Sequence, residues 1–145
     1  MSSTYSQLHF HVVFAVKDRL QRIDSLIQER LYQYIVGIVC NKNGIVHEMS
    51  GTQDHLHLLI SLPPALSIAD MIRFIKTNSS KWLHENFREM DCFAWQVGYS
   101  VFSVSHSNLE IVSRYIKNQK EHHRNISFQD ELATILKKHN IVIKS

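Results

Sequence analysis

The stretch Asp54-His55-Leu56-His57-Leu58-Leu59-Ile60 has apolar side chains at every second position and histidines between them. This alternation predicts a β-strand, in which residues two positions apart point to the same face of a sheet. The imidazoles of His55 and His57 would then lie side by side on one face, opposite the leucines. Two neutral imidazoles at this spacing can share one divalent metal ion. A pair of half-exposed strand histidines is the alternative interpretation.

A second stretch, Tyr115-Ile116-Lys117-Asn118-Gln119, lies in a segment predicted to be helical. Tyr115 and Gln119 are four residues apart, so they share one face of a helix. A hydroxyl nucleophile and an amide oxygen could therefore approach the same metal ion as the histidines. Taken alone, Tyr115 is explained as a tyrosine at the edge of the core and Gln119 as a surface residue. Four positions that fit one mechanism favour the catalytic interpretation.

Length and composition predict a soluble, cytoplasmic protein with one domain spanning residues 1–145. Hydrophobic residues make up 44% of the chain and charged residues 20%, which is ordinary for a globular protein. The net charge of +3, with ten further histidines, permits a polyanionic partner without requiring one. Cys40 and Cys92 form no Cys-x-x-Cys pair, so we expect buried small apolar residues in a reducing compartment. There is no signal-peptide pattern and no apolar run of the roughly twenty residues that span a bilayer.

The order of the predicted elements defines a fold class. Alternating patterns predict strands at residues 8–16, 45–50, 54–60 and 94–104. Cap residues and apolar periodicity predict helices that begin at Asp24, Ser67, Ser107 or Asn108, and Ser127. The last of these helices runs to about Lys138 and has a weak apolar side, formed by Glu131, Leu132, Ile135 and Leu136.

Strand, helix, strand, strand, helix and strand, followed by further helices, predict an α+β protein with a ferredoxin-like or RRM-like split βαβ antiparallel sheet. The first and third strands are central neighbours in this arrangement, and its two helices cover one sheet face. His9, His11, His55 and His57 would all project from the other face. The added C-terminal helix that carries Tyr115 must pack near that face to complete a site.

Such a site would support phosphoryl transfer. Mixed imidazole and oxygen ligands suit Mg²⁺ or Mn²⁺, and zinc would also fit two histidines. The ion would act as a Lewis acid on a phosphate oxygen while Tyr115 attacks in line and forms a phosphotyrosine. Because free tyrosine has a pKa of about 10, its deprotonation must be assisted by the metal, a basic residue or water. The phosphotyrosine retains the energy of the cleaved diester, so rejoining needs no nucleotide cofactor.

In this order and spacing, the motifs resemble the single-tyrosine HUH transposases of insertion sequences that move as single-stranded DNA. They also resemble the related REP-associated tyrosine transposases. The resemblance covers roughly residues 8–123. The motifs that carry it are residues 11–14 with Lys17 and Arg19, residues 54–59 with the His55-Leu56-His57 motif, residues 67–83 with Lys76, residues 95–99, and residues 115–119 followed by His122 and His123.

The resemblance implies that His55, His57 and Gln119 bind the metal ion. It implies that Tyr115 takes a 5′-phosphate and releases a 3′-hydroxyl. It also implies a homodimer, in some members with the tyrosine helix serving the partner's site, and single-stranded DNA substrates with hairpins at the element ends. Cleavage sites in the family are chosen by base pairing with a guide stretch. The candidate nucleic-acid contacts are His11, Lys17, Arg19, Arg73 and Lys76.

Three other interpretations remain open at this point. The chain could be a non-catalytic or domesticated protein that binds single-stranded nucleic acid on the same fold. It could be a metal-dependent phosphoesterase in which water attacks and Tyr115 is structural. It could also be a small-ligand domain with incidental histidines.

Overall fold

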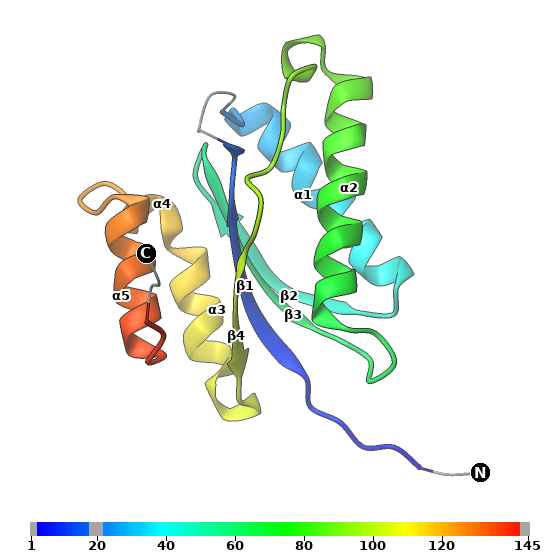
Figure 1. The fold of residues 1–145 in the computed structure, drawn as a ribbon, viewed down its shortest axis with the longest axis vertical. Helices are drawn as coiled ribbons and strands as arrows, with labels where there is room; N and C mark the ends of the chain where they lie inside the picture. Colours follow the sequence, from blue (N-terminus) through cyan, green and yellow to red (C-terminus); the bar gives the residue numbers. More distant parts are fainter. Residues whose placement is uncertain (1–2, 18–21, 143–145) are drawn as a thin grey trace.

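The computed structural model describes residues 3–17 and 22–142. Figure 1 shows a sheet that lies between two groups of helices. The strands are β1 (His9–Ala15), β2 (Ile45–Gly51), β3 (His55–Ser61) and β4 (Ser100–Val104). The helices are α1 (Ser25–Asn41), α2 (Ile68–Asn86), α3 (Leu109–Lys117), α4 (Gln119–His122) and α5 (Phe128–Lys138), with short 3₁₀ helices η2 (Arg88–Met90) and η3 (His106–Asn108).

The sheet has the strand order β2-β3-β1-β4, and each neighbouring pair is antiparallel. The helices α1 and α2 cover one face, whereas α3 and α5 lie on the other (Figure 1). The predicted α+β fold with a split βαβ sheet is therefore confirmed. The expectation that the third helix packs against the histidine face is confirmed as well.

Alternation along β1 and β3 separates an apolar face from a polar one. Val12, Phe14, Leu56, Leu58 and Ile60 point to the side of α1 and α2 and are almost completely buried there. The other face has a smaller apolar cluster, in which Leu59 and Val104 pack against Ile116 of α3. The histidines of β3 are buried on this second face, beside that cluster.

Helix starts agree with the capping residues that the sequence indicates. The Asp24 side chain accepts a hydrogen bond from the Ile27 amide at 2.9 Å, and Ser67 accepts one from Asp70 at 3.1 Å. Ser127 caps α5 in the same way. For α3 the N-cap is Asn108, without a side-chain hydrogen bond, because η3 leads directly into the helix.

The fourth strand is shorter than predicted. Only Ser100–Val104 joins the ladder, while Trp95 forms an isolated bridge with Val16. Gly98 lies between them with a φ of 92°, and this left-handed conformation interrupts the extended run. The Lys76 ammonium donates to the Gln96 and Gly98 carbonyl oxygens, which fixes this segment against α2.

Two further expectations need correction. Tyr115 and Gln119 do not share one continuous helix, because α3 ends at Lys117 and α4 begins after Asn118. Cys40 and Cys92 are exposed rather than buried. Within the described part of the chain, none of the helices combines the length and apolar character that crossing a membrane requires.

The last residue of β2, Gly51, has no room for a side chain beside β3. A Cβ atom there would lie 2.2 Å from the His55 carbonyl oxygen, so the backbone would have to move. We expect Gly51→Ala to lower the free energy of unfolding by about 1–3 kcal/mol, measured by urea denaturation. The matched control is Gly37→Ala in α1, where the Cβ meets nothing within 4 Å and should stabilise the helix by roughly 0.5–1 kcal/mol. Equal effects of the two substitutions would contradict this account.

Candidate active site

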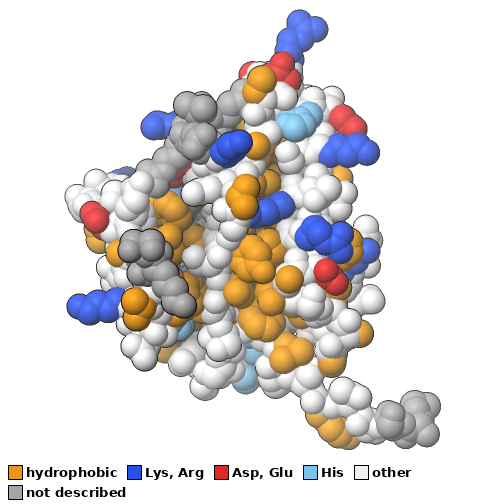
Figure 2. Space-filling view, in the orientation of Figure 1, with side chains coloured by type: hydrophobic (Ala, Val, Ile, Leu, Met, Phe, Trp, Pro, Cys, Tyr) orange, Lys and Arg blue, Asp and Glu red, His pale blue; other side chains and the backbone are white. Residues whose placement is uncertain are grey.

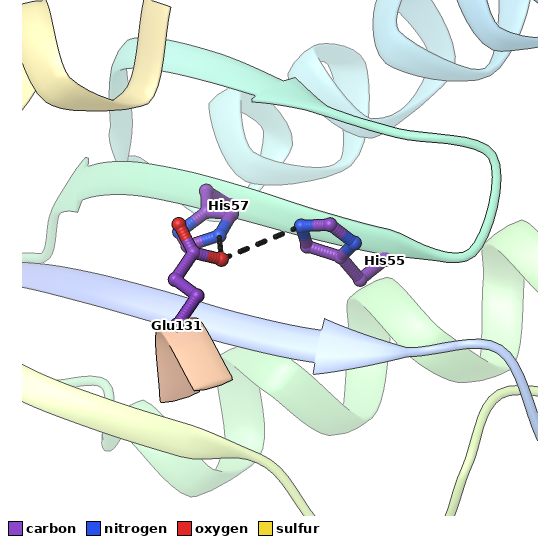
Figure 3. A group of neighbouring side chains, drawn as sticks. All are labelled: His55, His57 and Glu131. Atoms are coloured by element: carbon purple, nitrogen blue, oxygen red, sulfur yellow. Dashed lines mark hydrogen bonds and ion pairs between the residues drawn. The ribbon is translucent and has the colours of Figure 1, made fainter. Parts of the chain in front are cut away.

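The strand β3 places His55 and His57 on the face that α3, α4 and α5 cover. Both side chains are buried, at 2% and 0% exposure. Figure 3 shows the two imidazoles with the carboxylate of Glu131, which reaches them from α5. Three groups that can bind a metal ion therefore converge from a strand and a helix far apart in the sequence.

The orientation of His55 is set by the turn that precedes it. Its Nδ1 lies 2.9 Å from Asp54 Oδ1 and 2.7 Å from Thr52 Oγ1. The Thr52 hydroxyl donates to the same Asp54 oxygen, so both oxygens can accept from the imidazole. The Nδ1 atom therefore carries the proton, and the lone pair of Nε2 points into the site.

His57 is held from both sides. Its Nδ1 lies 2.8 Å from Nε2 of His11 on β1, and its Nε2 lies 3.1 Å from Glu131 Oε1. Burial, together with the neighbouring His57, lowers the pKa of His11 to about 3. Burial also lowers the pKa of His57, although the hydrogen bond with Glu131 acts in the opposite direction. Both rings are therefore neutral at neutral pH, as metal coordination requires.

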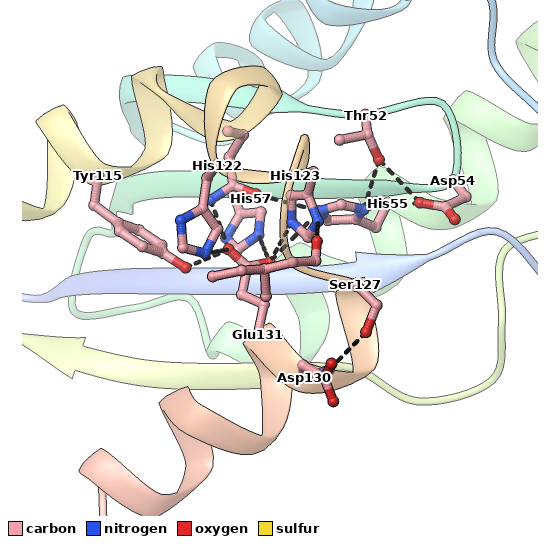
Figure 4. A network of polar contacts seen from close by, with 12 residues as sticks. Thr52, Asp54, His55, His57, Tyr115, His122, His123, Ser127, Asp130 and Glu131 are labelled. Carbon is pink, nitrogen blue, oxygen red and sulfur yellow. Dashed lines mark hydrogen bonds and ion pairs between the residues drawn. The ribbon is translucent and has the colours of Figure 1, made fainter.

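Glu131 is the centre of the polar network shown in Figure 4. Its Oε2 accepts hydrogen bonds from the Tyr115 hydroxyl and from Gln119 Nε2, the latter at 2.8 Å. His123 Nε2 lies 2.9 Å from Oε1. Burial works to raise the pKa of this carboxyl, but hydrogen bonds from His57, Tyr115 and Gln119 outweigh it and hold the pKa below its usual range.

Tyr115 is half-buried, and its hydroxyl points at this carboxylate. Burial raises the pKa of Tyr115 above its ordinary value, and the hydrogen bond to Glu131 raises it further. A negative charge beside the phenol disfavours the phenolate. The proton therefore rests on the tyrosine in this arrangement.

The residues fit a divalent metal ion. One ligand atom from each of His55, His57 and Glu131 lies within 4.8 Å of the others. Beside this triad, the Gln119 amide donates to Glu131, so its Oε1 faces His55 Nε2 at 3.2 Å. Glu131 Oε1 is 3.6 Å from the same nitrogen. These acceptors face one another without a proton between them, and a divalent ion bound between them would satisfy them.

The structure brings together Tyr115, His55, His57 and Gln119, the four residues selected from the sequence, despite the break at Asn118. The candidate nucleic-acid contacts lie elsewhere. His11 is buried behind His57, so the expected surface contact is corrected to a contact within the site.

Arg73 and Lys76 line a groove of about 500 Å³ between α2 and the segment that leads into β4. Figure 2 shows basic side chains beside an apolar area on this face. Lys17 is exposed just after β1, whereas Arg19 lies outside the described residues. Arg73 and Lys76 are on the opposite side of the sheet from α3, and Lys17 lies at the end of β1.

Sequence reasoning missed Glu131 and His123 as site residues. Glu131 was assigned to the weak apolar side of the last helix, which is where the structure places it, with 2% exposure. An acidic residue on a buried helix stripe needs partners, because an unpaired buried charge is very costly. That conflict was the available signal for a functional carboxylate.

Residues 4–119 match the sequence model of the family described as IS200-like transposases. The chain belongs to this family. A curated relative, the transposase of insertion element IS200 from Salmonella typhimurium, is 31% identical over 118 residues, which cover 77% of this chain and 76% of the relative. The ISDra2 transposase TnpA of Deinococcus radiodurans is 24% identical over 120 residues, which cover 79% of this chain and 86% of that one.

Solved structures of similar proteins support the fold of this transposase. A candidate transposase of Deinococcus radiodurans superposes with a TM-score of 0.64 at 22% identity, over 82% of this chain and 96% of that chain. A REP-associated tyrosine transposase bound to a REP hairpin gives a TM-score of 0.63 at 13% identity, over 85% of this chain and 74% of that chain. The transposase resemblance inferred from the HUH and tyrosine motifs is confirmed.

The lowered pKa of His11 predicts a loss of stability in acid. Its folded pKa of about 3 lies below the unfolded value of about 6.5, so the unfolded state binds more protons between these limits. The free energy of unfolding should therefore fall as the pH drops below about 6.5. In His11→Gln this slope should be shallower by up to about 1.4 kcal/mol per pH unit. Urea denaturation from pH 7 to pH 5 in the presence of EDTA measures it, and an unchanged slope would contradict the assignment.

Proposed function

We propose that this transposase cleaves and rejoins single-stranded DNA at insertion-sequence ends through a 5′-phosphotyrosine on Tyr115. The observation that carries the proposal is the convergence of the Tyr115 hydroxyl with the His55–His57–Glu131 triad. Phosphoryl transfer requires a positioned nucleophile and a group that stabilises the charge on the phosphate. Tyr115 and the triad would supply these two parts, and they meet at the Glu131 carboxylate.

In the proposed step, the Tyr115 oxygen forms a bond to phosphorus while the bond from phosphorus to the 3′-oxygen breaks. The phenolic proton leaves the nucleophile, and the departing 3′-oxygen gains a proton. Glu131 Oε2 accepts the hydrogen bond from Tyr115 and so orients the phenol, while its lowered pKa leaves removal of the phenolic proton to water or a basic residue. Rejoining is the same exchange in reverse with another 3′-hydroxyl.

Glu131 both orients and restrains the nucleophile. Its negative charge holds the phenol protonated, as the raised pKa of Tyr115 indicates. We assign the metal site to His55, His57 and Glu131, with Gln119 beside them and His11 holding His57 in place. A divalent ion there, Mg²⁺ or Mn²⁺ from the mixture of imidazole and oxygen donors, would polarise a phosphate oxygen and offset the carboxylate charge.

The proposed partner is single-stranded DNA that carries hairpins at the element ends. A solved structural neighbour, the REP-associated tyrosine transposase, is bound to a REP hairpin, which supports this choice. Exposed Lys17, the groove with Arg73 and Lys76, and Arg19 are the proposed phosphate contacts. The family resemblance also supports a homodimer, which analytical ultracentrifugation tests.

A covalent protein–DNA adduct is the expected product when the protein meets single-stranded DNA carrying its element ends. It should form with Mg²⁺ or Mn²⁺, be absent with a chelator, and be lost in Tyr115→Phe, as read on a denaturing gel. Tyr5→Phe, which changes an exposed tyrosine that precedes β1, should retain it. Cleavage that survives in Tyr115→Phe would instead identify water as the nucleophile, and hairpin binding without cleavage would identify a binding protein.

Loss of the Glu131 carboxylate should weaken metal binding. In Glu131→Gln we expect the rise in melting temperature on adding Mn²⁺ to disappear and adduct formation to fall at least roughly tenfold. Glu121→Gln is the matched control, because that carboxylate is exposed and pairs with Arg124 away from the triad. A normal Mn²⁺-dependent stabilisation in Glu131→Gln would remove Glu131 from the ligand set.

A further inference from the structure

A cleft of about 650 Å³ opens beside the active site, and neither Tyr115 nor any residue of the triad lines it. Its walls come from the start of α1, the turn between β2 and β3, and the chain from α4 into α5. The volume is within the range of about 300–1,000 Å³ that is typical of ligand sites. Asp54 and His123 belong both to the cleft and to the polar network of the site.

We propose that this cleft binds the nucleotide immediately 5′ of the scissile phosphate, whose 3′-hydroxyl departs. This inference rests on the proposed function and adds a substrate position to it. The direction follows from the order of groups in Figure 4, where Tyr115 lies at one end of the network and Thr52 and Asp54 lie at the other. Glu131, His57 and His55 lie between these ends.

The attacking and leaving oxygens of phosphoryl transfer lie roughly in line, on opposite sides of phosphorus. A phosphate within reach of the Tyr115 oxygen and of the triad therefore directs its departing oxygen away from Tyr115, toward Asp54. The cleft begins at this end of the network. The nucleotide attached to the departing 3′-oxygen would enter it.

The charges along the cleft suit a nucleic-acid backbone. Arg22, Lys120 and Arg124 line it and are exposed. The two acidic residues of the lining are engaged within the protein. Asp24 caps α1, and Asp54 accepts from Thr52 and contacts His55 Nδ1. Arg124 pairs with the exposed carboxylate of Glu121, so Arg22 and Lys120 supply most of the positive field that phosphate contacts require.

The cleft also has a surface for a base. The Phe128 ring lines it and stacks on His55, with 4.4 Å between ring centroids and 28° between planes. Aromatic rings are the usual platforms for bases of single-stranded DNA. Gln28 closes the wall as a fixed polar group, 6% exposed, with its amide donating to the Thr52 carbonyl at 3.2 Å. A nucleotide held here would keep its 3′-hydroxyl beside the phosphotyrosine for rejoining.

The test is a double-mutant cycle between the protein and the DNA. Wild-type protein first defines the scissile phosphate by adduct mapping. Binding of a fluorescent 12-nucleotide strand is then measured by anisotropy in the Tyr115→Phe background, with or without Phe128→Leu. The strand is intact, or has an abasic position directly 5′ or directly 3′ of the scissile phosphate.

We expect Phe128→Leu to weaken binding of intact DNA roughly tenfold. Phe128→Leu should not weaken binding of the 5′-abasic strand any further, but it should weaken binding of the 3′-abasic strand as much as that of intact DNA. The double variant Lys120→Ala/Arg124→Ala should reduce the slope of log affinity against log salt by about one to two. Lys137→Ala/Lys138→Ala, which removes two cations from the end of α5, is the matched control and should not change it.

Two failures can be distinguished. The cleft assignment is wrong if Phe128→Leu still weakens binding of the 5′-abasic strand, or if it no longer weakens binding of the 3′-abasic strand. In both cases the adduct would still support the proposed function. A salt slope that the Lys120/Arg124 variant leaves unchanged also overturns the cleft assignment. A wild-type protein that forms no adduct overturns the proposed function, and the cleft assignment with it.

Discussion

One buried carboxylate connects the helical layer to the sheet. Glu131 has 2% exposure, and a charge at that depth is tolerated only when several donors surround it. Those donors come from β3, α3 and α4, through His57, Tyr115 and Gln119. Each helix must therefore arrive in one position for the carboxylate to be satisfied. The same requirement that stabilises the packing also sets the distance between the Tyr115 hydroxyl and the two histidines of β3.

The second face of the sheet is divided between apolar and polar packing. Leu59 and Val104 meet Ile116 and attach α3 by hydrophobic contact, which is non-directional. His55 and His57 lie on the same face and are held by directional hydrogen bonds to Asp54 and His11. Apolar contacts hold the helix near the sheet, and the polar network then selects its exact position, because half-satisfied buried polar groups are unfavourable.

Local patterns allowed most of the fold to be predicted. Alternation defined β1 and β3, and the caps at Asp24 and Ser67 marked two helix starts, because these signals act within a few residues. The strand around Trp95 was predicted too long because a single left-handed Gly98 can break an alternating run without changing it. Glu131 was missed for a different reason. Its partner His57 is 74 residues away, and no local pattern encodes that contact.

The residues of the described site come from two separate regions of the chain, one before β4 and one after it. His11, Asp54, His55 and His57 belong to the sheet, whereas Tyr115, Gln119, His123 and Glu131 follow β4 and belong to α3, α4 and α5. Hydrogen bonds to Glu131 link the residues of the second set to one another, and a short connection joins α4 to α5. In a dimer that exchanged the tyrosine helix, this whole helical set would travel as one unit. Each site would then combine residues of two chains, and its Tyr115 and Glu131 would always come from the same chain.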